Sequence, residues 1–381
     1  MVDPEDEFII EAVAHAYNLD PSNYSDVVSA STITELAYLI GGVGSPDPKY
    51  DVPRDAYISD WSIEDLAKLL FLETATDIAV VHNLPLYCFT DGMVSLEKAA
   101  EAVDRYPNRF RAYAGIDPLR DSVEDLDRQV DMLNHPTGLK LYPTSWNGDT
   151  VTSWKMSDPK VIYPFYERAQ ELGIKVVAVH KAVPLGPIVA EDAFHPGDLE
   201  SAAGAFPDLT FEIVHGGIAF AEETAWLLAR FSNIYVNLEL SNIILERRPR
   251  TFSKMLVQWL SVGGMAMLDR LIWGTGAMIA HPRATIDAFC RYEVPEDLLE
   301  DAGLFAPLTP ITDDHKRNIL ANNYARIHGI DIEATKAAIA DDEFSRARAQ
   351  NPDPVPWSTL SKWEQIQQGR AAEAAEPVGV K

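Results

Sequence analysis

The chain has 381 residues, 47% of them hydrophobic, so it can bury the core of one large domain. Its 58 Asp and Glu residues against 32 Lys and Arg residues give a formal net charge of -26. A field of that sign repels phosphate backbones and anionic membrane surfaces, which argues against nucleic acid and membranes as partners.

The two cysteines, Cys88 and Cys290, lie far apart and form no CxxC pattern or other thiol cluster. Neither a disulfide framework nor a cysteine metal site is therefore indicated, and a reducing cytoplasm is the expected location. The acidic residues 1–8 precede an apolar run much shorter than a spanning helix. We expect neither a signal peptide nor a membrane anchor.

Apolar runs of strand length alternate with amphipathic stretches along most of the chain. Strands are expected at residues 8–14, 77–82, 110–116, 138–142, 175–180, 209–215, 234–239 and 270–274, and helices at residues 63–72, 96–106, 122–133, 163–172, 199–206, 222–230 and 252–263. Eight strands that alternate with helices predict parallel pairing, and we favour a closed (β/α)8 TIM barrel. A doubly wound sheet would ordinarily carry a glycine-rich phosphate turn after its first strand, where this chain has His-Ala-Tyr-Asn at residues 15–18.

Three segments stand outside this repeat. Residues 18–60, rich in Gly and Pro, are too long for an ordinary βα connection and are expected to form a lid or a contact surface. Residues 314–328 predict a closing helix packed on the barrel. We divide the chain into a barrel domain at residues 1–348 and a Pro/Ala/Glu-rich extension at residues 349–381. A frayed tail and a segment docked on another subunit are both open for the extension.

Three histidines follow predicted strands directly: His15, His180 and His215. Side chains at the carboxyl ends of barrel strands converge on one mouth. A single histidine there is more often a packed or hydrogen-bonded residue than a ligand. Three together predict a metal site, because neutral imidazoles are common nitrogen ligands and three protein ligands leave a position open for chemistry.

Three other histidines are weaker candidates. His82 ends the second strand, where a supporting role, a substrate contact and a structural role are all open. His195 and His281 are expected on loops, and we assign neither of them a role in the site.

Charged residues inside predicted strands also need an explanation. Lys140 lies within the fourth strand, where a charge requires a partner or a polar cavity. It is a candidate catalytic residue that contacts a substrate anion at the mouth, and a structural ion pair is the alternative. Glu11 and Glu239 raise the same question on the first and seventh strands.

Several motifs resemble the amidohydrolase-related family that includes aminocarboxymuconate semialdehyde decarboxylase, within the amidohydrolase superfamily. The likeness covers roughly residues 9–329. Its most specific pieces are Gly-Leu-Lys-Leu-Tyr-Pro at 138–143, Val-Ala-Val-His at 177–180, Glu-Ile-Val-His-Gly-Gly at 212–217 and Asn-Ile-Leu-Ala-Asn-Asn-Tyr-Ala-Arg at 318–326. The resemblance implies a metal-binding barrel that acts on a small molecule.

The sequence departs from the family's pattern at two of its five ligand positions. Complete family sites carry His-x-His on the first strand, one His on each of the fifth and sixth strands, and Asp after the eighth. On the first strand of this chain, either Val13 or Tyr17 takes the place of the second histidine. Gly276 stands at the aspartate's position, and glycine cannot act as a general base. We therefore expect one divalent ion per chain on the three histidines, with Zn first and Fe or Mn as alternatives.

Three functions from different classes are open. One is a metal-dependent hydrolase or nonoxidative decarboxylase of a small carboxylate. Another is a subunit of a non-haem metal-dependent monooxygenase that acts on a small amino acid, because the chain resembles the paired barrel subunits of the bacterial 2-aminoisobutyrate hydroxylases. The third is a scaffold without metal. The reduced site favours the oxygenase subunit, partnered by a paralogous barrel in a hetero-oligomer. A homo-oligomer is the other possible assembly.

Overall fold

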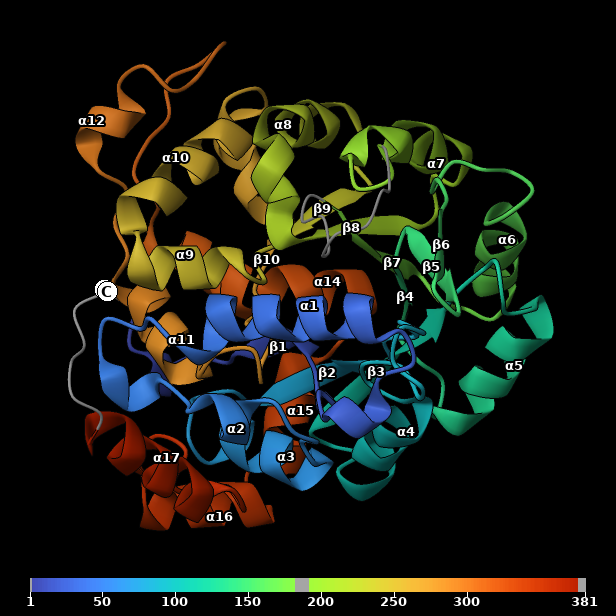
Figure 1. Ribbon diagram of the computed structural model, residues 1–381. Helices are drawn as coiled ribbons and strands as arrows, with labels where there is room; N and C mark the ends of the chain where they lie inside the picture. Colours follow the sequence, from blue (N-terminus) through green and yellow to red (C-terminus); the bar gives the residue numbers. More distant parts are fainter. Residues whose placement is uncertain (1, 182–191, 376–381) are drawn as a thin grey trace.

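Eight parallel strands form the wall of a barrel in the computed structural model, which describes residues 2–181 and 192–375 (Figure 1). Around the wall they follow the order β1 (Ile10–Ala14), β2 (Ile78–His82), β3 (Phe110–Ile116), β4 (Gly138–Leu141), β7 (Val176–His180), β8 (Thr210–Val214), β9 (Ile234–Asn237) and β10 (Leu271–Ile272). β10 meets β1 through backbone hydrogen bonds: the Ala12 N–H donates to the Trp273 carbonyl, and the His15 N–H donates to the Ala277 carbonyl. The predicted (β/α)8 TIM barrel is confirmed.

Branched and small side chains from the strands fill the interior of the barrel, as in other packed barrels. They come from Ile10, Ala12, Ile78, Val80, Val176, Ala178, Val214 and Ile272. The closing helix expected at residues 314–328 is present as α13 (Asp313–Arg317), the π-helical turn η8 (Asn318–Asn322) and α14 (Asn323–His328), followed by α15 (Ile332–Ile339). Tyr324 and Ile339 share the interior cluster with Phe8, which precedes β1. These helices therefore close the amino-terminal end of the barrel and leave the carboxyl end as the mouth.

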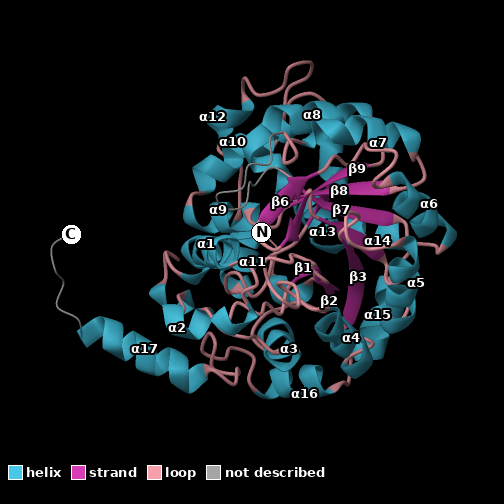
Figure 2. Ribbon diagram, turned by 45° about the vertical axis from the view of Figure 1, so that its right-hand side comes forward, coloured by secondary structure: helices cyan, strands magenta, loops and turns pink. Residues whose placement is uncertain are grey.

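Helices surround the strands (Figure 2). They are α3 (Ile63–Phe71), α4 (Leu96–Arg105), α5 (Val123–Met132), α6 (Tyr163–Glu171), α7 (Leu199–Ala205), α8 (Ala221–Arg230), α9 (Ser241–Arg247), α10 (Pro249–Leu260) and α11 (Pro282–Arg291), with α12 (Glu296–Leu299) on a following loop. In α3 the Ser62 hydroxyl caps the first turn by accepting the Asp65 N–H at 3.0 Å, and Leu66 and Leu70 are buried on its inner face. Within residues 2–181 and 192–375, no helix combines the length and apolar character that crossing a membrane requires.

The long first connection, residues 18–60, covers the mouth. It contains η2 (Pro21–Asn23), α1 (Val27–Ala37), the π-helical turn η3 (Tyr38–Gly42), η4 (Pro48–Tyr50) and α2 (Arg54–Tyr57). Asp26 caps α1 by accepting the Val28 N–H at 3.1 Å. In Figure 1, α1 lies across the barrel opening. The segment therefore has the position of a lid over the strand ends.

The described part of the C-terminal extension docks on its own barrel, which corrects the frayed-tail interpretation for these residues. Docking on another subunit stays a prediction. It includes α16 (Glu343–Gln350), which begins before residue 349, and α17 (Trp363–Ala375). Trp357 is only 1% exposed; its backbone N–H donates to Glu73, and its ring N–H donates to the Tyr50 carbonyl at 3.0 Å. The end of the predicted extension, 376–381, lies outside the described residues, and the domain boundary at 348 stays a prediction.

A hairpin that the sequence analysis did not predict follows β4. Its strands β5 (Thr144–Asn147) and β6 (Thr150–Ser153) pair antiparallel. The two-residue turn between them is Gly148-Asp149, and Gly148 has a φ of 62°. A glycine at the first position of a two-residue hairpin turn adopts positive φ at little cost, so Gly148 is the local signal for this hairpin.

Candidate functional site

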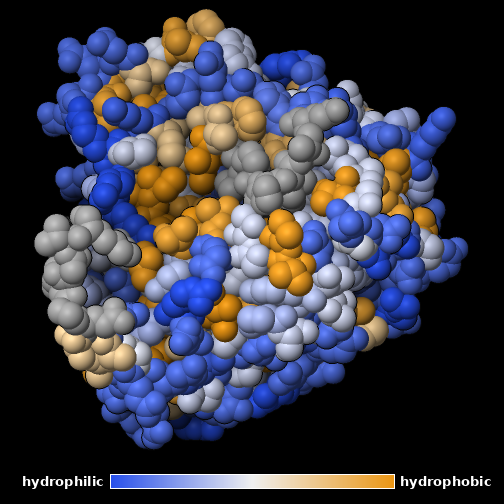
Figure 3. Space-filling view, viewed as in Figure 1, coloured by the Kyte–Doolittle hydropathy of each residue, from blue (hydrophilic) through white to orange (hydrophobic). Residues whose placement is uncertain are grey.

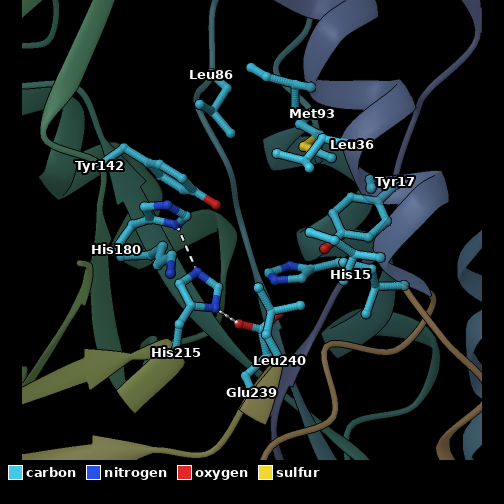
Figure 4. Close-up of a pocket in the computed structure, with 15 residues that line it drawn as sticks. His15, Tyr17, Leu36, Leu86, Met93, Tyr142, His180, His215, Glu239 and Leu240 are labelled. Carbon is cyan, nitrogen blue, oxygen red and sulfur yellow. Dashed lines mark hydrogen bonds and ion pairs between the residues drawn. The ribbon is translucent and has the colours of Figure 1, made fainter. Parts of the chain in front are cut away.

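A pocket with a volume of about 60 Å³ opens at the mouth, between the strand ends and α1 (Figure 4). Polar side chains from the barrel form one part of its lining: His15, Tyr17, Lys140, Tyr142, His180, His215 and Glu239. Apolar side chains form the rest: Ile33, Leu36, Ala37, Ile40, Leu86, Met93, Leu240 and Ile279. Figure 3 views the molecule from the same side as Figure 1 and shows apolar residues gathered on this face. The pocket suits a small ligand with polar and apolar parts.

The three histidines predicted as ligands all line this pocket. His15 follows β1, His180 ends β7 and His215 follows β8. His215 Nε2 and His180 Nδ1 lie 2.9 Å apart. In Figure 4 the His15 ring points toward these two from the opposite wall. The backbone of His215 has a φ of 72°, and the two glycines after it also have positive φ, so this left-handed turn aims the ring into the pocket.

The donor chemistry of the three neutral imidazoles suits a divalent metal ion. Two nitrogens that bind one zinc ion tetrahedrally at about 2.1 Å lie about 3.4 Å apart, whereas His215 Nε2 and His180 Nδ1 lie 2.9 Å apart, within hydrogen-bond distance of each other. His15 Nδ1 is buried and has no hydrogen-bond partner. Throughout residues 2–181 and 192–375, however, no three His, Cys, Asp or Glu side chains already stand in a coordinating arrangement. The ligand set of His15, His180 and His215 therefore stays a prediction.

Burial sets the charge states in the pocket. It lowers the pKa of His15 to about 3 and the pKa of His215 well below its ordinary value, so both imidazoles are neutral, as metal binding requires. Burial also lowers the pKa of Lys140 to about 8, against the opposing charges of Glu239 and Glu212. It raises the pKa of Glu239 to about 7, against His15 and Lys140.

On the first strand, Tyr17 rather than Val13 stands beside His15. The pairing of β1 with β2 shifts register between Glu11 and Ala14, which breaks the alternation expected from the sequence. Tyr17 lines the pocket, and its ring centroid lies 5.0 Å from that of His15. Glu11 is fully buried but bonds the eighth-strand turn instead, where it accepts the Thr275 N–H at 2.6 Å.

The remaining histidine candidates lie outside the pocket. His82 supports His15 from below: their rings meet edge to face at 5.6 Å, and His82 Nε2 lies 2.9 Å from the Ala12 carbonyl. His195 caps the short helix η5 (Pro196–Asp198). His281 is buried against Glu73, 2.8 Å away.

Sequence reasoning missed the apolar side of the pocket. Ile33, Leu36, Ala37 and Ile40 line it from α1 and the turn that follows. Their spacing of i, i+3, i+4 and i+7 is that of a helix face, and this signal could have identified them. Tyr142, which stacks on His180 with ring centroids 4.5 Å apart, was also missed as a pocket residue, although it belongs to the 138–143 motif.

Comparisons with known proteins agree with the fold. The profile of a family described as Amidohydrolase matches residues 46–330. An uncharacterized TIM-barrel protein from Bordetella bronchiseptica is 18% identical, with a TM-score of 0.58 over 84% of this chain and 99% of its own. 2,6-Dihydroxybenzoate decarboxylase from Rhizobium is 17% identical, with a TM-score of 0.53 over 85% and 99% of the two chains.

A variant of 5-carboxyvanillate decarboxylase from Novosphingobium aromaticivorans, with bound manganese, is 12% identical. Its TM-score is 0.51 over 86% of this chain and 98% of its own. No curated protein matches the chain. At these identities the solved structures support the fold alone.

Proposed function

This chain belongs to the amidohydrolase family, and we propose that it is a metal-dependent enzyme that decarboxylates or hydrolyses a small carboxylate substrate. His15, His180 and His215 would hold one divalent ion. Three imidazoles favour zinc, with manganese, the ion bound in the Novosphingobium decarboxylase, and iron as alternatives. A bound ion would act as a Lewis acid that polarises the substrate.

The observation that carries the proposal is the ammonium group of Lys140. Lys140 is 1% exposed and lines the same pocket as the three histidines. Among residues 2–181 and 192–375 its ammonium makes no direct hydrogen bond or salt bridge; it lies 5.0 Å from the centre of the Tyr142 ring and feels the charges of Glu239 and Glu212. A buried charge that makes no direct hydrogen bond is costly. A substrate carboxylate would supply the missing partner at the strand-end side of the pocket.

The other walls determine which carboxylates can enter. Leu36 and Ile40 from the lid segment and Tyr17 and Tyr142 from the barrel enclose the space above the strand ends. They exclude water from the reacting group, and the volume of about 60 Å³ restricts the pocket to a small carboxylate. Loss of a carboxylate as CO₂ becomes easier when the charge leaves water, so this enclosure favours decarboxylation over hydrolysis.

The test is release of ¹³CO₂ from a panel of small ¹³C-carboxylates by protein loaded in turn with Zn²⁺ and Mn²⁺. K140M should bind the active carboxylate at least 10-fold more weakly and lose turnover. K316M is the matched control, because Lys316 is also buried but donates to the Cys290 carbonyl at 2.8 Å, away from the pocket. Equal carboxylate binding by K140M and wild type would contradict the assigned role of Lys140.

A second candidate is the oxygenase subunit that the sequence analysis favoured. The observation on its side is the outer surface of the lid segment, where Val27, Val28 and Leu39 are each more than 60% exposed. Such residues suit a contact with a paralogous barrel. Co-expression with an adjacent paralogue should give a mixed oligomer that consumes O₂ with small amino acids. A homo-oligomer or monomer with no O₂ uptake would remove this candidate.

A further inference from the structure

Gly276 and Glu239 compete for one space at the mouth. Gly276 has a φ of 67°, and a Cβ atom built on it would lie 2.4 Å from Glu239 Oε1 and 2.9 Å from Glu239 Cγ. Heavy atoms cannot approach that closely. The Glu239 side chain from the seventh barrel strand therefore fills the room that a side chain after the eighth strand would need.

The Glu239 carboxylate is directed at one of the predicted metal ligands. Glu239 is 2% exposed, and its Oε2 contacts His215 Nδ1 (Figure 4). The other nitrogen of the same ring, Nε2, is the atom that faces His180 Nδ1. A carboxylate in ion-pair contact with Nδ1 favours the tautomer that carries the proton there and keeps the lone pair on Nε2, which makes that nitrogen a better ligand.

The backbone around this contact is held in an uncommon conformation. His215 and Leu240 are non-glycine residues with positive φ, 72° and 61°. The Glu239 N–H donates to Asn237 Oδ1 at 2.9 Å, and the Asn237 amide in turn donates to Glu212. Strained residues that the surrounding structure holds in place cluster at functional sites. Of the two strained residues here, His215 forms the contact with Glu239, and Leu240 directly follows Glu239 in the chain.

We infer that Glu239 is the carboxylate of the metal site, supplied from the seventh strand in place of the side chain that Gly276 lacks. It is a positioning residue, which holds His215 with Nε2 toward a divalent cation. The inference rests on the proposed function, because it requires that the histidines bind metal.

The first experiment measures metal affinity on the full-length protein stripped of metal, by competition for Zn²⁺ with a chromophoric chelator. E239Q should bind Zn²⁺ 10- to 100-fold more weakly than wild type, the usual loss when the partner of a metal-bound histidine is changed. E73Q is the matched control, because Glu73 and His281 form another buried carboxylate–histidine pair, outside the pocket. E73Q should bind Zn²⁺ like wild type.

A second readout separates positioning from a purely structural role. The visible absorption bands of the Co²⁺-loaded protein report the geometry of the ligands, so they should shift in E239Q and stay in place in E73Q. If E239Q binds Zn²⁺ as tightly as wild type, the inference is wrong while the proposed function stands. If wild type itself binds no metal, the proposed function fails first.

A further test does not depend on the stability of E239Q. It transfers the carboxylate from position 239, after the seventh strand, to position 276, after the eighth strand. Asp tolerates positive φ better than most residues, so G276D is compatible with the backbone once Glu239 is shortened. The double variant E239A/G276D should regain at least 5-fold in Zn²⁺ affinity over E239A. G276D alone should lose affinity because of the clash with Glu239. If E239A/G276D binds Zn²⁺ no more tightly than E239A, the inference that Glu239 stands in for a side chain at position 276 is wrong.

Discussion

Asp117, just after β3, illustrates how burial controls an ionisable side chain in this barrel. It is 3% exposed and accepts the Ser145 hydroxyl at 2.6 Å. Burial raises the pKa of Asp117 from 3.8 to about 6. The folded state therefore binds this proton more tightly than the unfolded state. The stability contributed at low pH is lost as the pH rises from about 4 to about 6.

Replacing Asp117 should remove this pH dependence. In D117N the free energy of unfolding relative to wild type should increase by about 1 kcal/mol between pH 5 and pH 7.5, because only wild type has to ionise a buried group. Urea unfolding of both proteins across that range measures the difference. A difference that is constant with pH would show that Asp117 is already ionised in the fold at pH 5.

At the level of single residues, the sequence identified the polar side chains of the pocket better than it identified the residues that contact them. His15, His180, His215 and Lys140 could be placed at one mouth because each lies in or directly after an apolar strand. The choice between Val13 and Tyr17 could not be made, because the register shift in β1 depends on its pairing with β2. The opposition of Gly276 and Glu239 is also invisible in sequence, since it joins two strands through space.

At the scale of elements, two segments from opposite ends of the chain hold each other at the mouth. Trp357 from the C-terminal extension bonds the Tyr50 carbonyl of the lid segment, and Arg370 in α17 donates to the Lys49 and Asp51 carbonyls. The Trp357 ring also meets His281 edge to face, with centroids 4.8 Å apart. The extension therefore acts as a strap that fixes the base of the lid.

Loss of the Trp357 anchor should destabilise this strap. W357A should lower the free energy of unfolding by about 3–5 kcal/mol, as expected for a fully buried aromatic side chain. It should also speed proteolysis within residues 18–60. V355A is the matched control, because Val355 lies two residues away and is 56% exposed, so its effect should stay within about 0.5 kcal/mol. Equal stability of W357A and wild type would contradict the strap.

These two elements were hard to predict for different physical reasons. α1 begins Val-Val-Ser-Ala-Ser-Thr-Ile-Thr, a run with low intrinsic helix propensity, and it is helical because its inner face is buried over the mouth. The position of Trp357 depends on Glu73 and Tyr50, which lie 284 and 307 residues earlier in the chain. The barrel itself was predictable, since its strands and helices show the expected local periodicity.

At the scale of the whole molecule, the net charge of -26 opposes the approach of an anionic substrate. Salt screens this long-range repulsion more than it screens a contact inside the pocket. The association rate constant of a carboxylate ligand should therefore rise several-fold between 20 mM and 200 mM NaCl. Stopped-flow binding measures the rate, with the uncharged amide analogue as the control. If the association rate constant of the carboxylate falls as the NaCl concentration rises, attraction by charges near the pocket outweighs the repulsion from the net charge.

We propose that the mouth of this amidohydrolase-family barrel holds one metal ion on His15, His180 and His215. The most direct test is the metal content of the protein purified without added metal, measured by mass spectrometry beside the double variant H180A/H215A. We expect about one divalent ion per wild-type chain, and none in the variant. A wild-type protein without metal, or a variant that keeps its ion, would contradict this metal site.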